Sequence, residues 1–492
     1  MLSVPLRRVV LAPLAVLTVA IAAGCGSSSD STADPAAVVP ARAPAYVEAT
    51  IAPEGDQRDD ALAAVRKVLA TNDPEGELRK LLRDAGGKGD VEPWIGEKVA
   101  VFALSASTRG THDGAVVAAT SDAAKAGDYV DAQGSKTETY KGTVLHIDAE
   151  GKAYALVEDR VVAGSPKAVR ASVDAAAGDA LAGADAFKDA LNRVEGEDGI
   201  GRAYLAPRAL MEAGGSSLPS AGGMFGSLAA GTLTGSLPSA LGAKFHADGN
   251  ALRADVATVG GAKPGEPADP AFVAGLTGKA WLAAGIGDVG SRLEEQLGGS
   301  DAILGLVSAQ AGLDVKKDLL SWMGEGAVFV TGDSPATIGG ALVVKSKDPA
   351  ATRAAVPKLG SLISRFATGA TVSDLQASGV DAGITVRAQG VPAPIQIAAA
   401  GDRFVIAVGQ GALQEAISPS SRLGDQADFK SAAATLGDNL QPTAYVAVSL
   451  LGSLAAFLGK DTQQAGDTLA RFTALVAADR GDGRFRASLG LR

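Results

Sequence analysis

The sequence has little of the material from which reactive sites are built. It contains one cysteine, Cys25, which excludes an internal disulfide framework, any cysteine cluster for zinc or iron–sulfur, and redox chemistry within the chain. Histidine is almost as scarce, with only His112, His146 and His246. Catalysis by histidine therefore has little support, and we interpret His146, in an expected strand, as a core or surface residue and not as a base.

The charge is acidic and dispersed. The formal net charge is −10, and no block of Lys and Arg stands against it, so nucleic acid is not an expected partner. Hydrophobic residues make up 47% and charged residues 20%, which is typical of a globular protein with sizeable cores. At 492 residues the chain exceeds the roughly 250–300 residues at which a single core stops growing, so two domains are expected.

Short motifs that carry chemistry are missing. No Gly-x-Ser-x-Gly elbow is present, since Gly332–Ala336 fails at its last position, and Gly278-Lys279 is followed by Ala280 where a phosphate loop needs Ser or Thr. Carboxylates are scattered without the spacing of a calcium loop. The sequence therefore predicts no catalytic residue, no cofactor and no metal ligand.

One glycine pattern imitates a nucleotide site. Residues Gly285–Gly290 match the dinucleotide fingerprint, after an expected strand and before an expected helix. No second parallel strand ending in an acidic residue about 20 residues further on is visible, and the equivalent turn of the first half reads Ala52–Gly55. We interpret the pattern as a glycine-rich strand-to-helix turn.

The N-terminus is typical of an export signal. Residues 1–24 carry Arg7 and Arg8 before an apolar stretch that is short for a membrane span. The following Ala22-Ala23-Gly24-Cys25 resembles the lipobox of bacterial lipoproteins, with Ala22 where a branched residue is usual. This predicts lipidation at Cys25 and an extracytoplasmic protein anchored to the cell membrane; the alternative is a plain secretory signal with an incidental cysteine. Residues 25–44 are expected to form a flexible tether.

An internal duplication organises the rest of the chain. Trp94-Ile95-Gly96-Glu97 precedes an apolar strand, and Trp322-Met323-Gly324-Glu325 does the same. We expect a first α+β unit at 45–260, a linker at 261–270 and a second unit at 271–492. In each unit Trp94 or Trp322 anchors a bend in the core, and Gly96 or Gly324 allows the bend.

Further segments recur in the same order. Leu252-Arg253-Ala254 returns as Phe485-Arg486-Ala487, and Trp281 is expected to take the position of Tyr46. Other echoes are Asp159–Val162 with Asp402–Val405, Phe187-Lys188 with Phe429-Lys430, and Tyr204–Ala206 with Tyr445–Ala447.

The fold class follows from the order of the elements. Strands come in runs with helices between some of them, which favours in each unit a largely antiparallel sheet with helices packed on it, and not a regular βαβ alternation. The stretch Ala213–Ala243 has no charged residue. Three interpretations of it are open: a transmembrane helix, a flap over an apolar groove, or a packed or disordered insertion without a specific role. Its prolines and glycines argue against the transmembrane helix.

Two recurrent features could be read as sites. Glu97 and Glu325 recur after the Trp-x-Gly turn, and one reading makes them paired functional acids; we interpret them as solvated carboxylates at a turn or strand start. The aromatic positions Tyr46, Trp281, Trp94 and Trp322 could line a ligand cavity, although such residues are more often core anchors.

The motif Leu319–Glu325 before a strand, with Phe429-Lys430 and Tyr445 downstream, is similar to the domain-of-unknown-function family numbered 3352. The resemblance covers most of Pro44–Arg492 and implies an envelope or secreted bacterial protein. The first copy departs from the motif with Val91-Glu92-Pro93 before Trp94. The family brings no catalytic residues.

Together these observations predict a lipid-anchored extracytoplasmic protein that acts by binding or structural interaction at the cell envelope. An apolar ligand such as a lipid, with Ala213–Ala243 as its cover, is a narrower form of the same hypothesis. Its partners would be the membrane, through the lipidated cysteine, and an apolar ligand or envelope protein. The rival is an envelope hydrolase that uses unrecognised Ser or carboxylate groups.

Overall fold

The computed structural model describes residues 33–492 apart from several internal stretches. These are 81–87, 106–112, 215–236, 262–265, 299–313 and 452–465, together with positions 52, 54, 75, 78, 79, 197, 198, 335, 368, 390, 392, 467 and 468. We call residues 33–260 the first half and residues 266–492 the second half. The uncharged stretch Ala213–Ala243 lies mostly outside the described residues.

The described residues of the first half form ten strands with helices between them. Its elements are η1 (Pro35–Val38), β1 (Ala45–Thr50), α2 (Gly55–Leu69), β2 (Ile95–Ala103), β3 (Gly114–Thr120), α4 (Ala123–Asp131), β4 (Lys136–Tyr140), β5 (Thr143–Ile147), β6 (Ala153–Val157), β7 (Arg160–Gly164), α5 (Pro166–Ala176), η2 (Leu181–Gly183), α6 (Asp185–Asn192), β8 (Gly201–Leu205), α7 (Pro207–Gly214), β9 (Ala240–Ala247) and β10 (Ala251–Val259).

Ten further strands lie in the part of the second half that the structure describes. Its elements are α9 (Pro270–Ala274), β11 (Leu282–Asp288), α10 (Val289–Gly298), η3 (Val315–Leu320), β12 (Met323–Thr331), β13 (Gly339–Ser346), α12 (Pro349–Phe366), β14 (Thr371–Asp374), β15 (Ala382–Arg387), β16 (Ile395–Ala400), β17 (Arg403–Val408), α13 (Ala412–Ile417), η4 (Leu423–Asp425), α14 (Ala427–Ala434), β18 (Ala444–Val446), β19 (Phe472–Gly481) and β20 (Arg484–Leu491).

All the described strands join in one sheet of 20 strands, and every pairing is antiparallel. The α+β class and the antiparallel sheet predicted from the sequence are confirmed. The halves share this one sheet, because β10 pairs with β20. An edge strand has unpaired backbone donors and acceptors, and each half satisfies those of the other.

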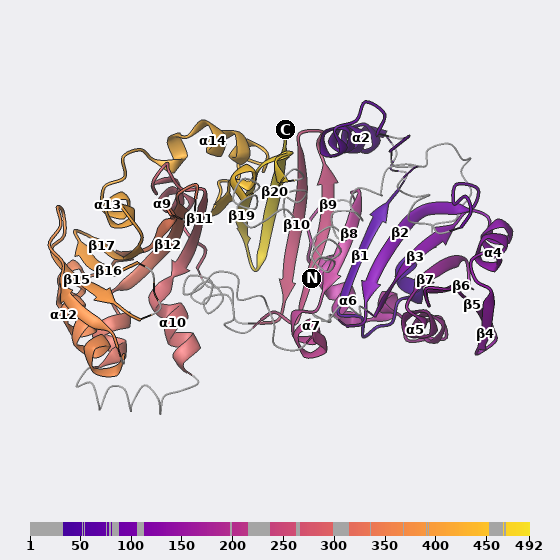
Figure 1. Ribbon diagram of the computed structural model, residues 1–492, viewed down its shortest axis with the longest axis horizontal. Coiled ribbons are helices and arrows are strands. Elements are labelled where there is room, and N and C mark those ends of the chain that lie inside the picture. The colour runs from indigo at the N-terminus through magenta and orange to yellow at the C-terminus, as the bar shows by residue number, and fades with distance from the viewer. Residues whose placement is uncertain are drawn as a thin grey trace.

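The strand order reads alike from both edges. In the first half the pairings run β4-β5-β6-β7-β3-β2-β1-β8-β9-β10. In the second half they run β14-β15-β16-β17-β13-β12-β11-β18-β19-β20. The pair β10–β20 stands at the centre, and the halves extend from it as two wings (Figure 1).

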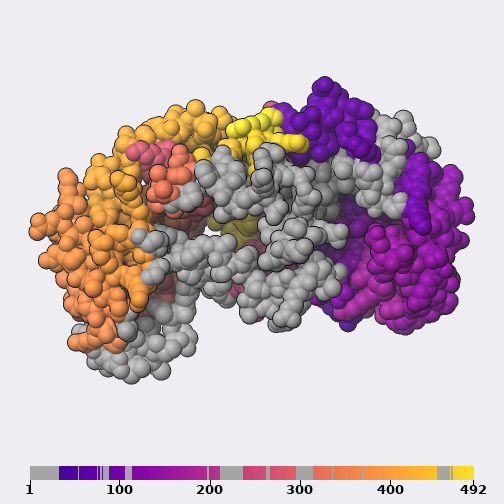
Figure 2. Space-filling model, viewed as in Figure 1, coloured from indigo at the N-terminus to yellow at the C-terminus, as the bar shows by residue number. Residues whose placement is uncertain are grey.

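Each face of the sheet carries two clusters of buried apolar side chains. On one face, Trp94 with α2 and α4 forms a cluster in the first half, and Trp322 with η3 and α12 forms one in the second. On the other face, η1, α5 and α6 cover the first half, and α9, α13 and α14 cover the second. We call these the Trp face and the α6/α14 face. The space-filling view shows the two ends as bulky bodies (Figure 2).

The start of the first half differs from the expected tether. Residues 35–43 pack on the α6/α14 face, where Ala36 and Val38 are fully buried. Asp34 accepts a hydrogen bond from the backbone N–H of Ala36 and forms an ion pair with Arg202 at 2.6 Å. The alanines, valines and prolines that suggested a tether are small enough to fill space beside α5 and η2.

Candidate functional site

The candidate site lies where the halves join, on strands β9, β10, β20 and β19. Side chains alternate between the two faces of a strand, so each of these strands serves both faces. Residues directly opposite each other in an antiparallel pair point to the same face. The pairings therefore decide which residues meet on each side.

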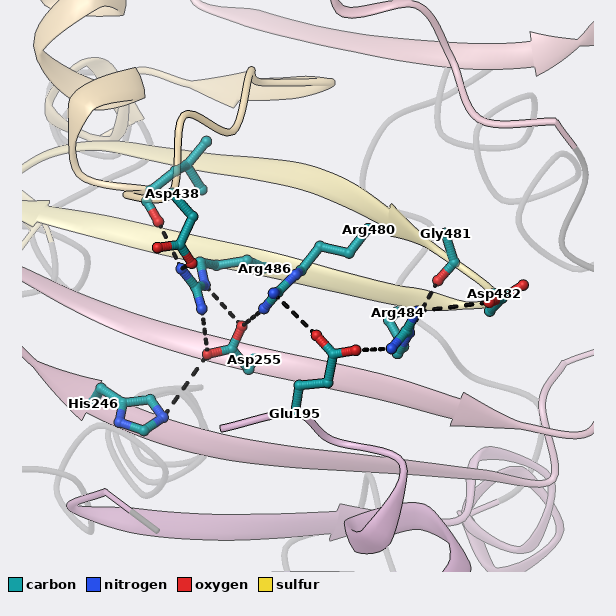
Figure 3. Close-up of polar contacts among 10 residues, drawn as sticks. Glu195, His246, Asp255, Asp438, Arg480, Gly481, Asp482, Arg484 and Arg486 are labelled. Carbon is teal, nitrogen blue, oxygen red and sulfur yellow. Dashed lines mark hydrogen bonds and ion pairs between the residues drawn. The ribbon is translucent and has the colours of Figure 1, made fainter. Parts of the chain in front are cut away.

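The α6/α14 face of the junction is ionic (Figure 3). Asp255 of β10, only 5% exposed, accepts bonds from Arg486 of β20 through Nε at 2.7 Å and Nη2 at 3.1 Å, and from Nη1 of Arg480 at 3.0 Å. Arg486 also pairs with Asp438 at 2.7 Å, and Arg480 with Glu195 at 3.0 Å. Hydrogen bonds and opposite charges thus satisfy the buried carboxylate.

His246 borders this ionic cluster. Its Nε2 lies 3.8 Å from Asp255 Oδ2. Burial lowers the pKa of His246, and Arg486, Lys244 and Arg253 lower it further, while Asp255 opposes the shift. These effects favour the neutral imidazole, while the ion pairs of Asp255 with Arg486 and Arg480 fasten β10 to β20 and β19.

The Trp face of the same strands is apolar. A cross-strand row of alanines runs over five neighbouring strands through the ladder partners Ala254↔Ala487, Ala487↔Ala477, Ala477↔Ala444 and Ala444↔Ala284. We call Ala254, Ala487, Ala477, Ala444 and Ala284 the alanine row. All five are half-buried, and none belongs to the four core clusters among the described residues.

Larger apolar side chains border the alanine row. On one side, two residues along each strand, stand the successive ladder partners Leu252, Leu489, Leu475, Val446 and Leu282. On the other side Val256 of β10 faces Phe485 of β20. Phe245, opposite Ala254, and Val328, opposite Ala284, stand at the two ends. Leu475 is 39% exposed, although burial would be expected for leucine in a core strand.

The tryptophans of the recurrent motif are core residues. Trp94 is 3% exposed and its ring lies 4.8 Å from that of Tyr129. Trp322 is 1% exposed, lies 5.0 Å from Phe404, and donates from Nε1 to the carbonyl of Asp318 at 3.0 Å. They belong to separate clusters at opposite ends of the sheet. They do not line a shared cavity.

The motif glycines serve close backbone packing. A Cβ on Gly96 would lie 3.0 Å from the carbonyl of Ala119, and one on Gly324 would lie 2.8 Å from the carbonyl of Lys345. Both glycines stand where the ladder register shifts at the start of the strand. Gly96 and Gly324 therefore shape a bulge against the neighbouring strand.

The recurrent glutamates remain apart. Glu97 is exposed on β2, whereas Glu325 accepts a hydrogen bond from the backbone N–H of Asp269 at 2.5 Å. Burial raises the pKa of Glu325. Since β2 and β12 lie in different wings, the structure does not bring the two carboxylates together.

Other residues of the protein occupy the space beside the glycines of the fingerprint. A Cβ on Gly287 would lie 1.7 Å from the carbonyl oxygen of Glu266, and one on Gly290 would lie 2.4 Å from that of Leu320. Asp288 occupies the start of α10, where it accepts from the backbone N–H of Ser291 at 3.0 Å and pairs with Lys347 at 2.6 Å. Backbone and a carboxylate thus stand where a pyrophosphate would have to approach.

The pairings also correct one equivalence inferred from the sequence. Ala283, and not Trp281, takes the ladder position of Tyr46: Tyr46 faces Tyr204 and Phe102, and Ala283 faces Tyr445 and Phe329. The echo between Leu252–Ala254 and Phe485–Ala487 marks two segments that pair directly, with Ala254 opposite Ala487.

A buried polar group at the start of the first half was missed by sequence reasoning. Glu48, 3% exposed, accepts from the Tyr46 hydroxyl at 2.5 Å and from Arg202 at 2.8 Å. Burial and the neighbouring Glu48 raise the pKa of Tyr46 well above its usual value. Arg202 also holds Asp34, so this group fastens η1 to the sheet. The charged Glu48 inside an alternating apolar strand was the available signal.

Other candidate residues give no catalytic centre. His146, in β5, pairs through Nε2 with Asp131 at 3.1 Å, while His112 lies outside the described residues. Among the described residues there is no group of three His, Cys, Asp or Glu that could hold a metal ion. No helix in the described part of the chain is long and apolar enough to cross a membrane. Cys25, the predicted lipidation site, lies outside the described residues.

The comparisons with known proteins are sparse. No curated protein matches the chain. Two similar solved structures are crystal forms III and I of TP0453, each 10% identical. Form III covers 78% of this chain and 98% of its own with a TM-score of 0.20, and form I covers 79% and 98% with a TM-score of 0.18. Such TM-scores support no inference.

The family comparison concerns the first half. The matched range does not include Leu319–Glu325, the motif on which the resemblance in the sequence rests. Residues 9–226 match the model described as "Protein of unknown function (DUF3352)", so the resemblance to this family is confirmed over that part of the chain.

Proposed function

We propose that this protein is a lipid-anchored extracytoplasmic protein that binds an apolar ligand at the cell envelope. The alanine row with its leucine border is the observation that carries the proposal. Ligand sites are mostly apolar surfaces, and Leu475, which is 39% exposed on this central sheet face, is otherwise unfavourable in water. The lipobox at Cys25 supports the location.

The polar groups of the described residues favour binding over catalysis. Asp255 and Glu48 are both buried, and arginines neutralise both. A catalytic group needs a free acceptor or donor aimed at a substrate. The hydrogen bonds of these carboxylates instead hold segments of the fold together.

We also propose that the two halves arose by duplication. The matching strand order supports it, and so do two ring contacts, Phe187–Tyr204 at 5.5 Å and Phe429–Tyr445 at 5.4 Å, at corresponding places in the halves. When two copies of such a unit pair through their last strands, a row of side chains continues from one copy into the other. This continuation gives the alanine row its length.

Native mass spectrometry of the protein purified from its source membrane tests the ligand. We expect a bound species with the mass of a lipid. Repeated absence of any such species, in mild detergent and after reconstitution with lipid, would contradict apolar-ligand binding.

Anchoring is tested separately. Cys25→Ala should release the protein to the soluble fraction or leave an unprocessed precursor, whereas the parent protein should enter the detergent phase. Unchanged detergent-phase partitioning of the variant would overturn the lipoprotein assignment without touching the ligand proposal.

A further inference from the structure

We infer that the ligand is a single lipid molecule, one of whose acyl chains lies along the alanine row, across the junction of the two halves. The inference rests on the proposed function and names the ligand class and its place. It excludes docking of the bilayer surface and pairing with a second copy of the chain. Two observations carry it: the dimensions of the row, and the face from which the membrane anchor leaves.

The alanine row has the length of one acyl chain. Neighbouring strands lie about 4.8 Å apart, so five strands span about 19 Å between the first and last alanine. The hydrocarbon core of a bilayer is about 30 Å thick and holds two leaflets, so one chain spans about 15 Å. Phe245 and Val328 stand as larger residues beyond the two ends of the row.

The row also has the cross-section for one chain. Alanine side chains end at Cβ, while the leucines and valine that border them extend further from the sheet. Leu252, Leu489 and Leu475 are successive ladder partners and form a continuous border. On the opposite side Phe485 faces Val256. On β19 the partner of Phe485 is Asp479, so an acyl chain on the row contacts apolar side chains along the whole leucine side and, on the other side, at Val256 and Phe485.

The membrane anchor leaves from the opposite face. The first described residue, Ala33, precedes Asp34, which Arg202 holds on the α6/α14 face. Cys25 is eight residues before Ala33, because 33 − 25 = 8, and such a segment reaches at most about 28 Å when fully extended. Ala36 and Val38 of η1 pack in the cluster of the α6/α14 face, so the sheet lies between the start of this connection and the Trp face.

The short connection therefore directs the α6/α14 face toward the anchoring membrane and the alanine row away from it. A row turned away from the bilayer cannot lie flat upon it. Its occupant has to be a lipid that has left the membrane as a single molecule.

The experiment measures palmitate binding to the full-length Cys25→Ala protein by isothermal titration calorimetry. Ala477→Leu/Ala487→Leu fills the row while keeping residues that suit strands, and Leu475→Glu places a charge in its border. Ile338→Glu is the control, since Ile338 is an exposed apolar residue, at 46%, in the β12–β13 connection. Circular dichroism and the thermal midpoint report folding of every variant.

We expect at least a tenfold loss of palmitate affinity in both row variants and unchanged affinity in Ile338→Glu. Palmitate bound equally by folded parent and row variants would overturn the place of the ligand but leave the proposed function standing. No palmitate binding by the parent, together with no lipid in native mass spectrometry, would overturn both. If one row variant fails to fold, the other decides.

Two further measurements separate the competing occupants. Flotation of the Cys25→Ala protein with phosphatidylglycerol vesicles, lost on Leu475→Glu, would instead assign the row to the bilayer surface. A dimer in sedimentation that Leu475→Glu dissociates would assign it to a second copy. We expect the parent neither to float nor to dimerise.

Discussion

Asp255 and Arg486 stand directly opposite each other in the β10–β20 ladder, and two nitrogens of the arginine bond the two oxygens of the carboxylate. This contact joins residues 231 positions apart, at the one pairing among the described strands that connects the two wings of the sheet. The carboxylate is almost completely buried, so the pair is coupled strongly to the integrity of the junction.

A double-mutant cycle should show this coupling. We expect Asp255→Ala to lower the free energy of unfolding by about 3–5 kcal/mol, because it leaves Arg486 and Arg480 close together without their shared anion. Arg486→Ala should also be destabilising, and the double variant should lose about 0.5–3 kcal/mol less than the sum. Urea unfolding measures all three. Additive losses would contradict the coupling, and Glu77→Ala, from an exposed pair with Lys80, should cost at most about 1 kcal/mol.

Arg202 should hold the N-terminal segment on the sheet. In Arg202→Met, Glu48 loses its main cation and Asp34 its ion pair, so we expect residues 35–43 to detach. Limited proteolysis with trypsin should then cut after the exposed Arg42 several-fold faster than in the parent. Arg170→Met, which removes a half-exposed pair with Glu138, is the control. Equal cleavage of both variants would contradict the fastening role.

The glycine fingerprint should prove structural. Gly287→Ala places a methyl group against the carbonyl of Glu266, and we expect a loss of about 1–3 kcal/mol in the free energy of unfolding. Gly127→Ala is the matched control, because a Cβ there meets no neighbour and alanine favours α4 by up to about 1 kcal/mol. The same substitution should thus have opposite signs at the two positions, as measured by thermal unfolding. A neutral Gly287→Ala would reopen the site to a ligand.

Glu415 should make stability depend on pH. Burial acts to raise its pKa, but hydrogen bonds from Lys279, Thr277 and Ser420 outweigh burial and lower the pKa to about 2. A lowered folded pKa stabilises the protein above the unfolded value of 4.5, and this contribution is lost as pH falls from 4.5 towards 2. Glu415→Gln should therefore be less stable than the parent at pH 7, with the difference shrinking below pH 4.5. A difference that is constant with pH would contradict this assignment.

Most of the local elements could be predicted from the sequence. Hydrophobic periodicity indicated the strands at 114–120 and 143–147, and Pro166 marked the start of α5. β4 was missed because Lys136–Tyr140 is polar and lies at the edge of the sheet, where no burial imposes an apolar pattern. The tether expected at 25–44 was misjudged at residues 35–43, because composition cannot show that small residues will pack in a core cluster.

The sequence by itself determined the class of the fold, the scarcity of reactive groups and the order of the elements, because periodicity, composition and turn residues act over short stretches of chain. Only the tertiary structure decided that β10 meets β20, since pairing between residues such as Asp255 and Arg486, 231 positions apart, leaves no local pattern. That pairing sets the register, and the register brings five alanines from two halves into one row on one face and gathers the charges on the other.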